Sequence, residues 1–192
     1  MTRPLPTLDP AATALVLVDL QRGIVGRQTQ PHPADEVVRN GVRLARAAKE
    51  RGALVVLVYV SGAADGADMV RMDVEERPAF QLTPGWDEIV EELRPLADVV
   101  VHKRQWGAFY GTDLDLQLRR RGRRTLVLGG ISTNFGVEST ARAAFERNYQ
   151  LVLVEDAMAG FSTEDHAFAI GRIFPRLGRI ASTEDVLAAW RG

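Results

Sequence analysis

Asp19 and Lys103 are the residues of this sequence whose types and positions could carry out proton transfer. Each lies at the carboxyl end of a mostly apolar segment, 12–19 for Asp19 and 98–102 for Lys103, and such segments are typical of strands buried on both faces of a sheet. A lysine beside a carboxylate at a cleft can hold and tune it for acid or base chemistry. A structural ion pair at the end of a sheet would have the same spacing, so both interpretations stay open.

A polar loop, residues 131–135, lies between the apolar run 125–128 and a segment with helical spacing that starts at Gly136. Open parallel sheets bind ligands at such loops, where a strand ends and a helix begins. The unpaired N–H groups and the positive dipole end of the helix favour a carboxylate or a developing oxyanion. The loop is therefore a candidate binding segment, although an ordinary turn would show the same pattern.

Apolar runs and amphipathic segments alternate along the chain. Strands are predicted over 12–19, 53–60, 98–102, 125–128, 151–154 and 177–180, and helices over 34–51, 86–93, 112–121, from 136, 163–174 and 183–190. This alternation predicts a single domain, residues 1–192, with a three-layer α/β/α Rossmann-like fold and a mostly parallel six-stranded sheet. The carboxyl ends of parallel strands share one edge, so Asp19, Lys103 and the 131–136 loop can meet if their strands are close neighbours.

The composition excludes several classes of protein. The 24 Lys and Arg residues balance 25 Asp and Glu residues, so no charge excess favours nucleic acid or an anionic membrane. The absence of cysteine excludes disulfides, thiolate metal sites and cysteine nucleophiles. No apolar run approaches the ~20 residues that span a bilayer, and residues 1–10 lack a signal-peptide apolar region. We therefore expect a cytoplasmic protein with a small-molecule substrate.

Three motifs resemble the isochorismatase-like hydrolase superfamily, a family of mostly cysteine hydrolases. They are residues 16–21 (VLVDLQ), 103–109 (KRQWGAF) and 129–141 (GGISTNFGVESTA). The resemblance runs from residue 12 to the final helix and is closest to a bacterial subgroup that shares the run KRQWGAFYGTDL. It implies that Asp19 and Lys103 stand at two positions of the catalytic triad, and that Gly136 stands at the position of the family cysteine.

The glycine at position 136 removes the family's thiol nucleophile, so a covalent cysteine mechanism is not available. The resemblance also implies a cis peptide bond between Ile131 and Ser132. The metal-binding branch of the family carries an Asp-x-His pattern after the second strand; none follows Val60, so we expect no metal and no other cofactor. Candidates for substrate contacts are Gln21, Arg104, Trp106, Phe109, Ile131, Ser132, Thr133, Asn134 and Phe135.

Isochorismatases proper resemble this chain in having glycine at the cysteine position. Their reaction, cleavage of an enol-pyruvyl (vinyl) ether, needs an acid that protonates the vinyl carbon and no protein nucleophile. By this analogy Asp19 would be the general acid on a small carboxylate-bearing substrate, with Lys103 as its partner. The Lys103 cation lowers the pKa of Asp19 whereas an acid needs it raised, so burial must outweigh the pair. Gly107 also departs from the family, which usually has serine there.

Two other functions stay open. The chain could be a catalytically inactive member that binds a ligand or serves as an oligomeric scaffold, or an amidase with a serine or threonine nucleophile. The hydroxyl candidates are Ser132, Thr133, Ser139 and Thr140. Each could instead bond the backbone, and none has an evident histidine partner.

Family members usually form dimers or higher oligomers, so the resemblance implies a homodimer or higher homo-oligomer. Trp86, Trp106 and the segment 61–85 could supply the contact surface. That segment, rich in Gly, Ala, Asp and Pro, is long for a loop of a compact domain, which also makes it a candidate lid.

Overall fold

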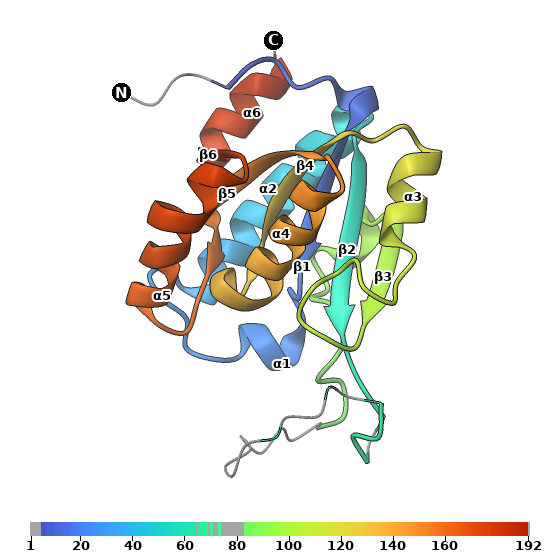
Figure 1. Ribbon diagram of the computed structural model, residues 1–192, viewed down its shortest axis with the longest axis vertical. Coiled ribbons are helices and arrows are strands. Elements are labelled where there is room, and N and C mark those ends of the chain that lie inside the picture. Colours follow the sequence, from blue (N-terminus) through green and yellow to red (C-terminus); the bar gives the residue numbers. More distant parts are fainter. Residues whose placement is uncertain (1–4, 64, 69, 71–72, 74–82, 192) are drawn as a thin grey trace.

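The protein, seen here as a computed structural model, is described over residues 5–63, 65–68, 70, 73 and 83–191 (Figure 1). The strands of this part are β1 (Thr13–Val18), β2 (Leu54–Val60), β3 (Val99–Lys103), β4 (Thr125–Ile131), β5 (Gln150–Ala159) and β6 (Arg179–Ala181). The α-helices are α1 (Arg22–Val25), α2 (Ala34–Arg51), α3 (Leu114–Arg120), α4 (Glu138–Glu146), α5 (Thr163–Phe168) and α6 (Thr183–Arg191). Single π turns, Thr133–Val137 and Ala169–Ile173, adjoin α4 and α5.

The strands form one six-stranded sheet in the order β3-β2-β1-β4-β5-β6, and every neighbouring pair is parallel. This confirms the predicted α/β fold and corrects "mostly parallel" to wholly parallel. The chain first builds outward from β1 to β3 on one side, then returns to place β4 on the other side of β1. Ligands of open α/β sheets bind at this kind of reversal. The sheet order thus puts the end of β1 beside the end of β4.

Both faces of the sheet are buried, as the continuous apolar runs predicted. Along β1, Leu15 and Leu17 pack into the core beneath α2 and α6, and Val16 and Val18 pack into the core beneath α3 and α4. Successive side chains of a strand point to opposite faces, so a strand covered on both sides is apolar throughout. Figure 1 shows the sheet between these two helical layers.

Glycine at position 130 allows β1 and β4 to approach closely. Gly130 has a φ of 128°, and a Cβ atom built there would lie 2.1 Å from the carbonyl oxygen of Val18. No other residue fits, because a Cβ at this position would overlap the β1 backbone. The prediction that the fourth strand stops at 128 is therefore wrong: β4 continues through both glycines to Ile131, and β5 likewise continues past 154 to Ala159.

The helix predicted over 86–93 is wrong. These residues form turns and an isolated bridge between Gln21 and Ile89. Several of their backbone groups bond to the segment after β1: Val90 N donates to Leu20 O at 3.1 Å, and Arg22 N donates to Glu88 O at 2.8 Å. These long-range bonds replace the intrahelical bonds that the local sequence pattern suggested.

The remaining boundary differences are small. The helix predicted over 163–174 begins as α5 and then widens into the π turn Ala169–Ile173. The helix predicted from 112 begins at Leu114, and the Thr112 hydroxyl accepts a hydrogen bond from the Leu114 amide at 3.2 Å. The last strand, predicted over 177–180, lies at Arg179–Ala181.

The segment proposed as a lid or subunit contact lies largely outside the described residues, which lack 64, 69, 71–72 and 74–82. Trp86 is partly buried and packs closely against Gly23, where a Cβ atom would lie 1.8 Å from its ring. Trp106 is exposed. Oligomer formation stays a prediction.

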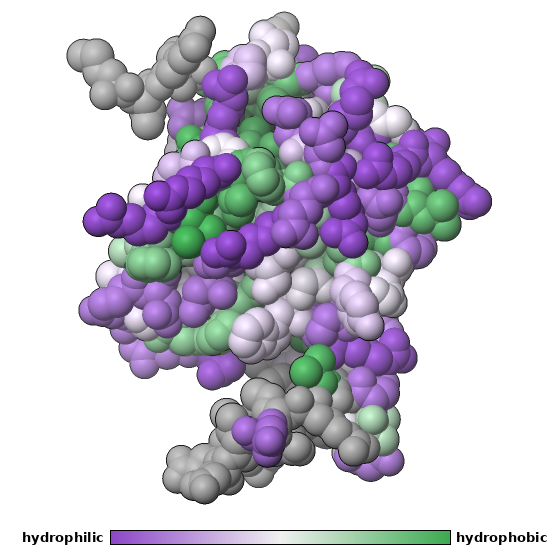
Figure 2. Space-filling view, viewed as in Figure 1, coloured by the Kyte–Doolittle hydropathy of each residue, from purple (hydrophilic) through white to green (hydrophobic). Residues whose placement is uncertain are grey.

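The surface around α4 is dominated by hydrophilic side chains, with smaller hydrophobic areas between them (Figure 2). Among the helices that the structure describes, none is long and apolar enough to cross a membrane.

Candidate active site

Asp19 and Lys103 form a buried ion pair at the carboxyl edge of the sheet. Lys103 Nζ donates to Asp19 Oδ2 at 2.7 Å and to the Gln105 carbonyl oxygen at 3.0 Å. The side chains are 6% and 1% exposed. Asp19 directly follows β1, whereas Lys103 ends β3, two strands away. The long lysine side chain therefore reaches across the end of β2, and the two residues meet as the sequence predicted.

Burial affects the pKa of Asp19 more strongly than Lys103 does. Loss of solvent raises the pKa of the Asp19 carboxyl to about 6, although the charge and hydrogen bond of Lys103 lower it. The second carboxyl oxygen, Oδ1, is buried with no hydrogen-bond partner among the described residues. An unpartnered buried acceptor is costly, and a proton on it removes its charge. The arrangement thus favours a carboxyl that carries its proton on Oδ1 while Oδ2 accepts from Lys103.

Gly136 faces this carboxyl. A Cβ atom at residue 136 would lie 3.1 Å from Asp19 Oδ2, 3.1 Å from Val18 Cγ1 and 3.5 Å from the Trp106 carbonyl oxygen. A side chain at residue 136 would therefore point at the acid, and here this position carries only backbone. The space is too narrow for a side chain unless a neighbour moves by a few tenths of an ångström.

An aromatic pair lies on the outside of this edge. The Trp106 and Phe135 rings are tilted against each other with their centroids 4.8 Å apart, and both are exposed, Trp106 at 59% and Phe135 at 36%. Trp106 follows the lysine, and Phe135 precedes Gly136. The two rings can therefore stack against a substrate that approaches Asp19 from solvent.

Hydrogen bonds hold the backbone that carries Asp19. Asp19 has a φ of 56°, a left-handed conformation in which aspartate and asparagine are enriched. Its amide donates to the Val58 carbonyl oxygen at 2.8 Å. The buried Gln21 side chain donates to Val60 O at 2.9 Å and accepts from Val60 N at 2.8 Å. Its amide is thus engaged by β2, which assigns it to positioning Asp19 rather than to contacting a substrate.

The 131–136 loop is largely buried. The peptide bond between Ile131 and Ser132 is cis, as predicted. Ile131, Ser132 and Thr133 are buried, whereas the Asn134 Oδ1 atom is buried without a hydrogen-bond partner among the described residues. Among the candidate substrate contacts in this loop, Phe135 is the exposed one.

Two other candidates lie apart from the ion pair. Arg104 is half exposed and forms an ion pair with Asp68. Phe109 is buried in the core beneath α3 and α4, where its ring lies 5.8 Å from that of Tyr149. Phe109 therefore has a packing role in this structure.

Two of the four candidate hydroxyl groups near Gly136, those of Thr140 and Thr133, are hydrogen-bonded. Thr140 Oγ1 donates to the Gly136 carbonyl oxygen at 2.6 Å and accepts from the Ala108 amide at 3.1 Å. Thr133 has a histidine partner that the sequence did not suggest: its hydroxyl lies 2.8 Å from His166 Nδ1. Thr133 is fully buried, and its hydroxyl is engaged by this histidine.

His166 belongs to a cluster that the sequence did not predict. Its Nε2 atom lies 3.3 Å from Glu155 Oε1, and the same oxygen lies 2.8 Å from His32 Nε2. These two contacts join residues 11 and 123 positions apart, so no local pattern could have found the cluster. The sequence did offer one indication: Glu155 directly follows the apolar run 151–154, as Asp19 follows β1.

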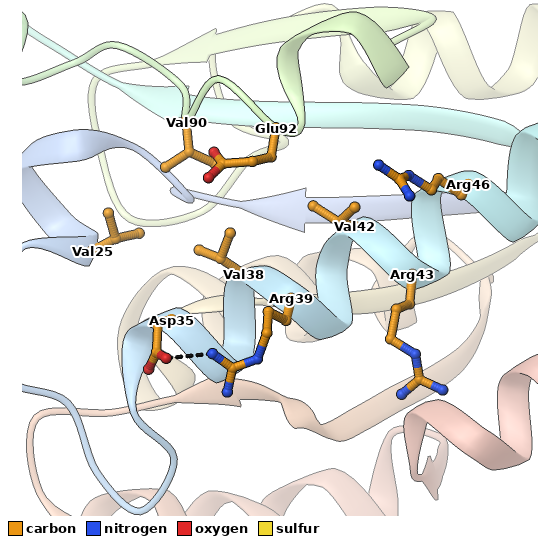
Figure 3. Close-up of a pocket in the computed structure, with 9 residues that line it drawn as sticks. All are labelled: Val25, Asp35, Val38, Arg39, Val42, Arg43, Arg46, Val90 and Glu92. Atoms are coloured by element: carbon orange, nitrogen blue, oxygen red, sulfur yellow. Dashed lines mark hydrogen bonds and ion pairs between the residues drawn. The ribbon is translucent and has the colours of Figure 1, made fainter.

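A pocket of about 650 Å³ lies away from the ion pair, along the outer side of α2. Val38 and Val42 of α2 face Val25 and Val90 across it, with arginines around its rim (Figure 3). Its lining includes neither member of the ion pair nor Gly136. Asp19 and Lys103 themselves are buried.

Comparison with known proteins shows the family. The isochorismatase domain matches residues 13–185. The chain is 47% identical over 184 residues to an uncharacterized isochorismatase family protein, YecD, of Escherichia coli O157:H7, covering 95% of this chain and 98% of that protein. It is 45% identical over 188 residues to another, YwoC, of Bacillus subtilis (strain 168), covering 94% and 95% of the two chains.

A solved structure agrees with these sequence relationships. That of an isochorismatase family protein from Burkholderia thailandensis superimposes with a TM-score of 0.91 at 46% identity, covering 97% of this chain and 99% of that one. The sheet order, the buried Asp19–Lys103 pair and these similarities lead to one assignment. The chain belongs to the isochorismatase-like hydrolase family.

Proposed function

We propose that the protein hydrolyses a small carboxylate-bearing enol-pyruvyl (vinyl) ether, with Asp19 as the general acid. The observation that carries this proposal is the Asp19 carboxyl, buried beside Gly136 with its pKa raised to about 6 and Oδ1 unpartnered. An acid of this pKa is largely protonated in mildly acidic solution and still partly so at pH 7, which suits proton donation near neutrality.

The proposed reaction needs no covalent intermediate on the enzyme. Asp19 transfers its proton to the terminal vinyl carbon, which leaves an oxocarbenium ion at the ether carbon. The negative charge of the Asp19 carboxylate, formed by loss of the proton, stabilises that cation together with the other charges and dipoles of the site. Water then adds to the cation and returns a proton to Asp19, and the hemiketal collapses to pyruvate and an alcohol. Lys103 holds Oδ2, which leaves Oδ1 to carry the proton.

Isochorismate is the substrate with which to test this proposal, since its cleavage yields pyruvate. The pH dependence of kcat/KM gives the sharpest result. Because the acid form of Asp19 is active and its pKa is raised to about 6, we expect kcat/KM to be constant below about pH 6 and to fall about tenfold per pH unit above it. The measurement is loss of isochorismate absorbance between pH 4.5 and 8.5. A rate that rises with pH across this range would exclude Asp19 as the acid.

Replacing Gly136 with alanine should lower activity. The added Cβ would lie 3.1 Å from Asp19 Oδ2, so the carboxyl must shift by a few tenths of an ångström, and we expect kcat/KM to fall about tenfold. Gly171→Ala is the matched control, because a Cβ at residue 171 meets no atom within 4 Å. Steady-state rates of both variants on isochorismate make the comparison. Unchanged turnover in Gly136→Ala would show that this space is not part of the site.

The burial of the ion pair favours a second candidate, a non-catalytic member of the family that binds a ligand or serves as a scaffold. With side chains 6% and 1% exposed, Asp19 and Lys103 could hold together the carboxyl edge of the sheet without touching a substrate. The two candidates differ in turnover. Pyruvate release by wild-type protein that disappears in Asp19→Ala supports the enzyme, and equal rates in the two proteins support the scaffold.

A further inference from the structure

We infer that His32, Glu155 and His166 form a binding site for a divalent transition-metal ion, with Zn²⁺ the best fit. The site is separate from Asp19 and is built from three different segments. His32 lies in the loop before α2, Glu155 within β5, and His166 in α5. One donor atom from each residue lies within 4.8 Å of the other two.

The spacing of the three donors is close to what a metal requires. Glu155 Oε1 lies 2.8 Å from His32 Nε2 and 3.3 Å from His166 Nε2. Ligands bound at about 2.0–2.1 Å in tetrahedral geometry are separated by roughly 3.3 Å. The two imidazole donors lie within 4.8 Å of each other, so side-chain rotations can bring all three donors to the spacing of a bound ion.

The outer nitrogen of His166 also has a partner of the kind that metal-binding histidines use. His166 Nδ1 lies 2.8 Å from the Thr133 hydroxyl, and such a contact favours the tautomer that leaves Nε2 free to bind the ion. His32 Nδ1 faces a Glu36 carboxylate oxygen at 3.7 Å, which is beyond hydrogen-bond distance. A hydroxyl can donate or accept, so Thr133 suits His166 both with and without a metal.

The cluster is held in place by contacts that do not involve its own ligand atoms. Residue 30 is joined to Gly160, just past the end of β5, by two backbone hydrogen bonds of 2.9 and 2.7 Å. The Thr29 hydroxyl donates to the His32 carbonyl oxygen at 2.8 Å. The loop that carries His32 is thus fastened beside the strand that carries Glu155, and a preorganised site loses less entropy when it binds.

The donor set selects the class of ion. Two imidazoles and one carboxylate are a common zinc set when solvent provides the fourth ligand, and the same set also binds Fe²⁺, Co²⁺ and Ni²⁺. Calcium and magnesium prefer oxygen ligands. The position also allows a water ligand, since the Glu155 side chain is 35% and the His32 side chain 21% exposed, although His166 is buried.

Calorimetric titration of untagged, chelator-treated protein with Zn²⁺ tests this site. The chain has three histidines and no cysteine, so His102 is the one imidazole of the sequence that lies outside the cluster. We expect one equivalent of Zn²⁺ to bind with micromolar or tighter affinity, and His32→Gln and Glu155→Gln to weaken binding about tenfold or more. His102→Gln is the matched control, because His102 lies on β3 and stacks on Tyr59; its affinity should equal that of the wild type.

Cobalt gives a second readout that does not depend on activity. Co²⁺ bound to two imidazoles and a carboxylate in a tetrahedral or five-coordinate site absorbs visible light strongly, and the bands should vanish in His32→Gln. Circular dichroism confirms that each variant is folded. Wild-type protein that binds no Zn²⁺ at 100 μM, or a loss of binding in His102→Gln while His32→Gln retains it, would overturn the assignment.

Discussion

Asp19→Asn is expected to lower kcat/KM on a vinyl-ether substrate by about 10²- to 10⁴-fold, the usual contribution of a general acid. The amide cannot supply the proton, but it keeps the shape of the carboxyl, and asparagine adopts the left-handed conformation of residue 19 as readily as aspartate. Lys103 can still donate to the side-chain oxygen. The loss should therefore appear in turnover, with the melting temperature at pH 5 close to that of the wild type.

Asp98→Asn is the control for this variant. Asp98 pairs with Lys49 at 2.6 Å, much as Asp19 pairs with Lys103, but it precedes β3 and so lies at the opposite end of the sheet from the active site. Its rate should stay within about twofold of the wild type, because exposed pairs contribute little. If Asp19→Asn turned over isochorismate as fast as Asp98→Asn, proton donation by residue 19 would be excluded.

Lys103→Met should have the largest effect on stability, and this effect should depend on pH. Removing one partner of a buried ion pair costs about 3–5 kcal/mol when the other charge stays behind. Without Lys103, the pKa of Asp19 rises further, because the lysine is what lowers it. At pH 8 the variant must either bury a lone carboxylate or protonate it far above its usual pKa. At pH 5 the Asp19 carboxyl is mostly neutral already, so the penalty should be much smaller.

Denaturant unfolding at pH 5 and pH 8 measures this difference. Lys49→Met removes the matched exposed lysine, whose side chain is 38% exposed, and should cost at most about 1 kcal/mol at either pH. In Lys103→Met, the pH at which kcat/KM begins to fall should also move above pH 6. Equal destabilisation by Lys103→Met at the two pH values would show that Asp19 does not change its protonation state between them, which contradicts a pKa of about 6.

The carboxyl edge of the sheet could be predicted because both of its charged residues follow buried apolar runs. Parallel strands end at a common edge, so Asp19 and Lys103, each at the carboxyl end of a strand, were expected to lie near each other there. The sign of the pKa shift could not be predicted in the same way. It depends on whether the loss of solvent around Asp19 raises the pKa more than the charge and hydrogen bond of Lys103 lower it. Both effects are set by the folded structure and cannot be read from the sequence.

Local patterns failed where distant backbone groups intervene. The helix predicted over 86–93 gives way to bonds with the segment after β1, and the strand that seemed to end at Gly129 continues because Gly130 packs against Val18. The cluster of His32, Glu155 and His166 was missed for a related reason. Its members come from three segments, and each histidine taken alone had an ordinary explanation.

Glycine at position 136 also determines how the protein responds to its chemical surroundings. An enzyme that relies on a thiolate is open to alkylation, and peroxide can oxidise the sulfur beyond repair. A carboxyl that donates a proton and takes it back is not oxidised in this way, and the sequence contains no cysteine. The proposed chemistry therefore does not depend on keeping a thiol reduced.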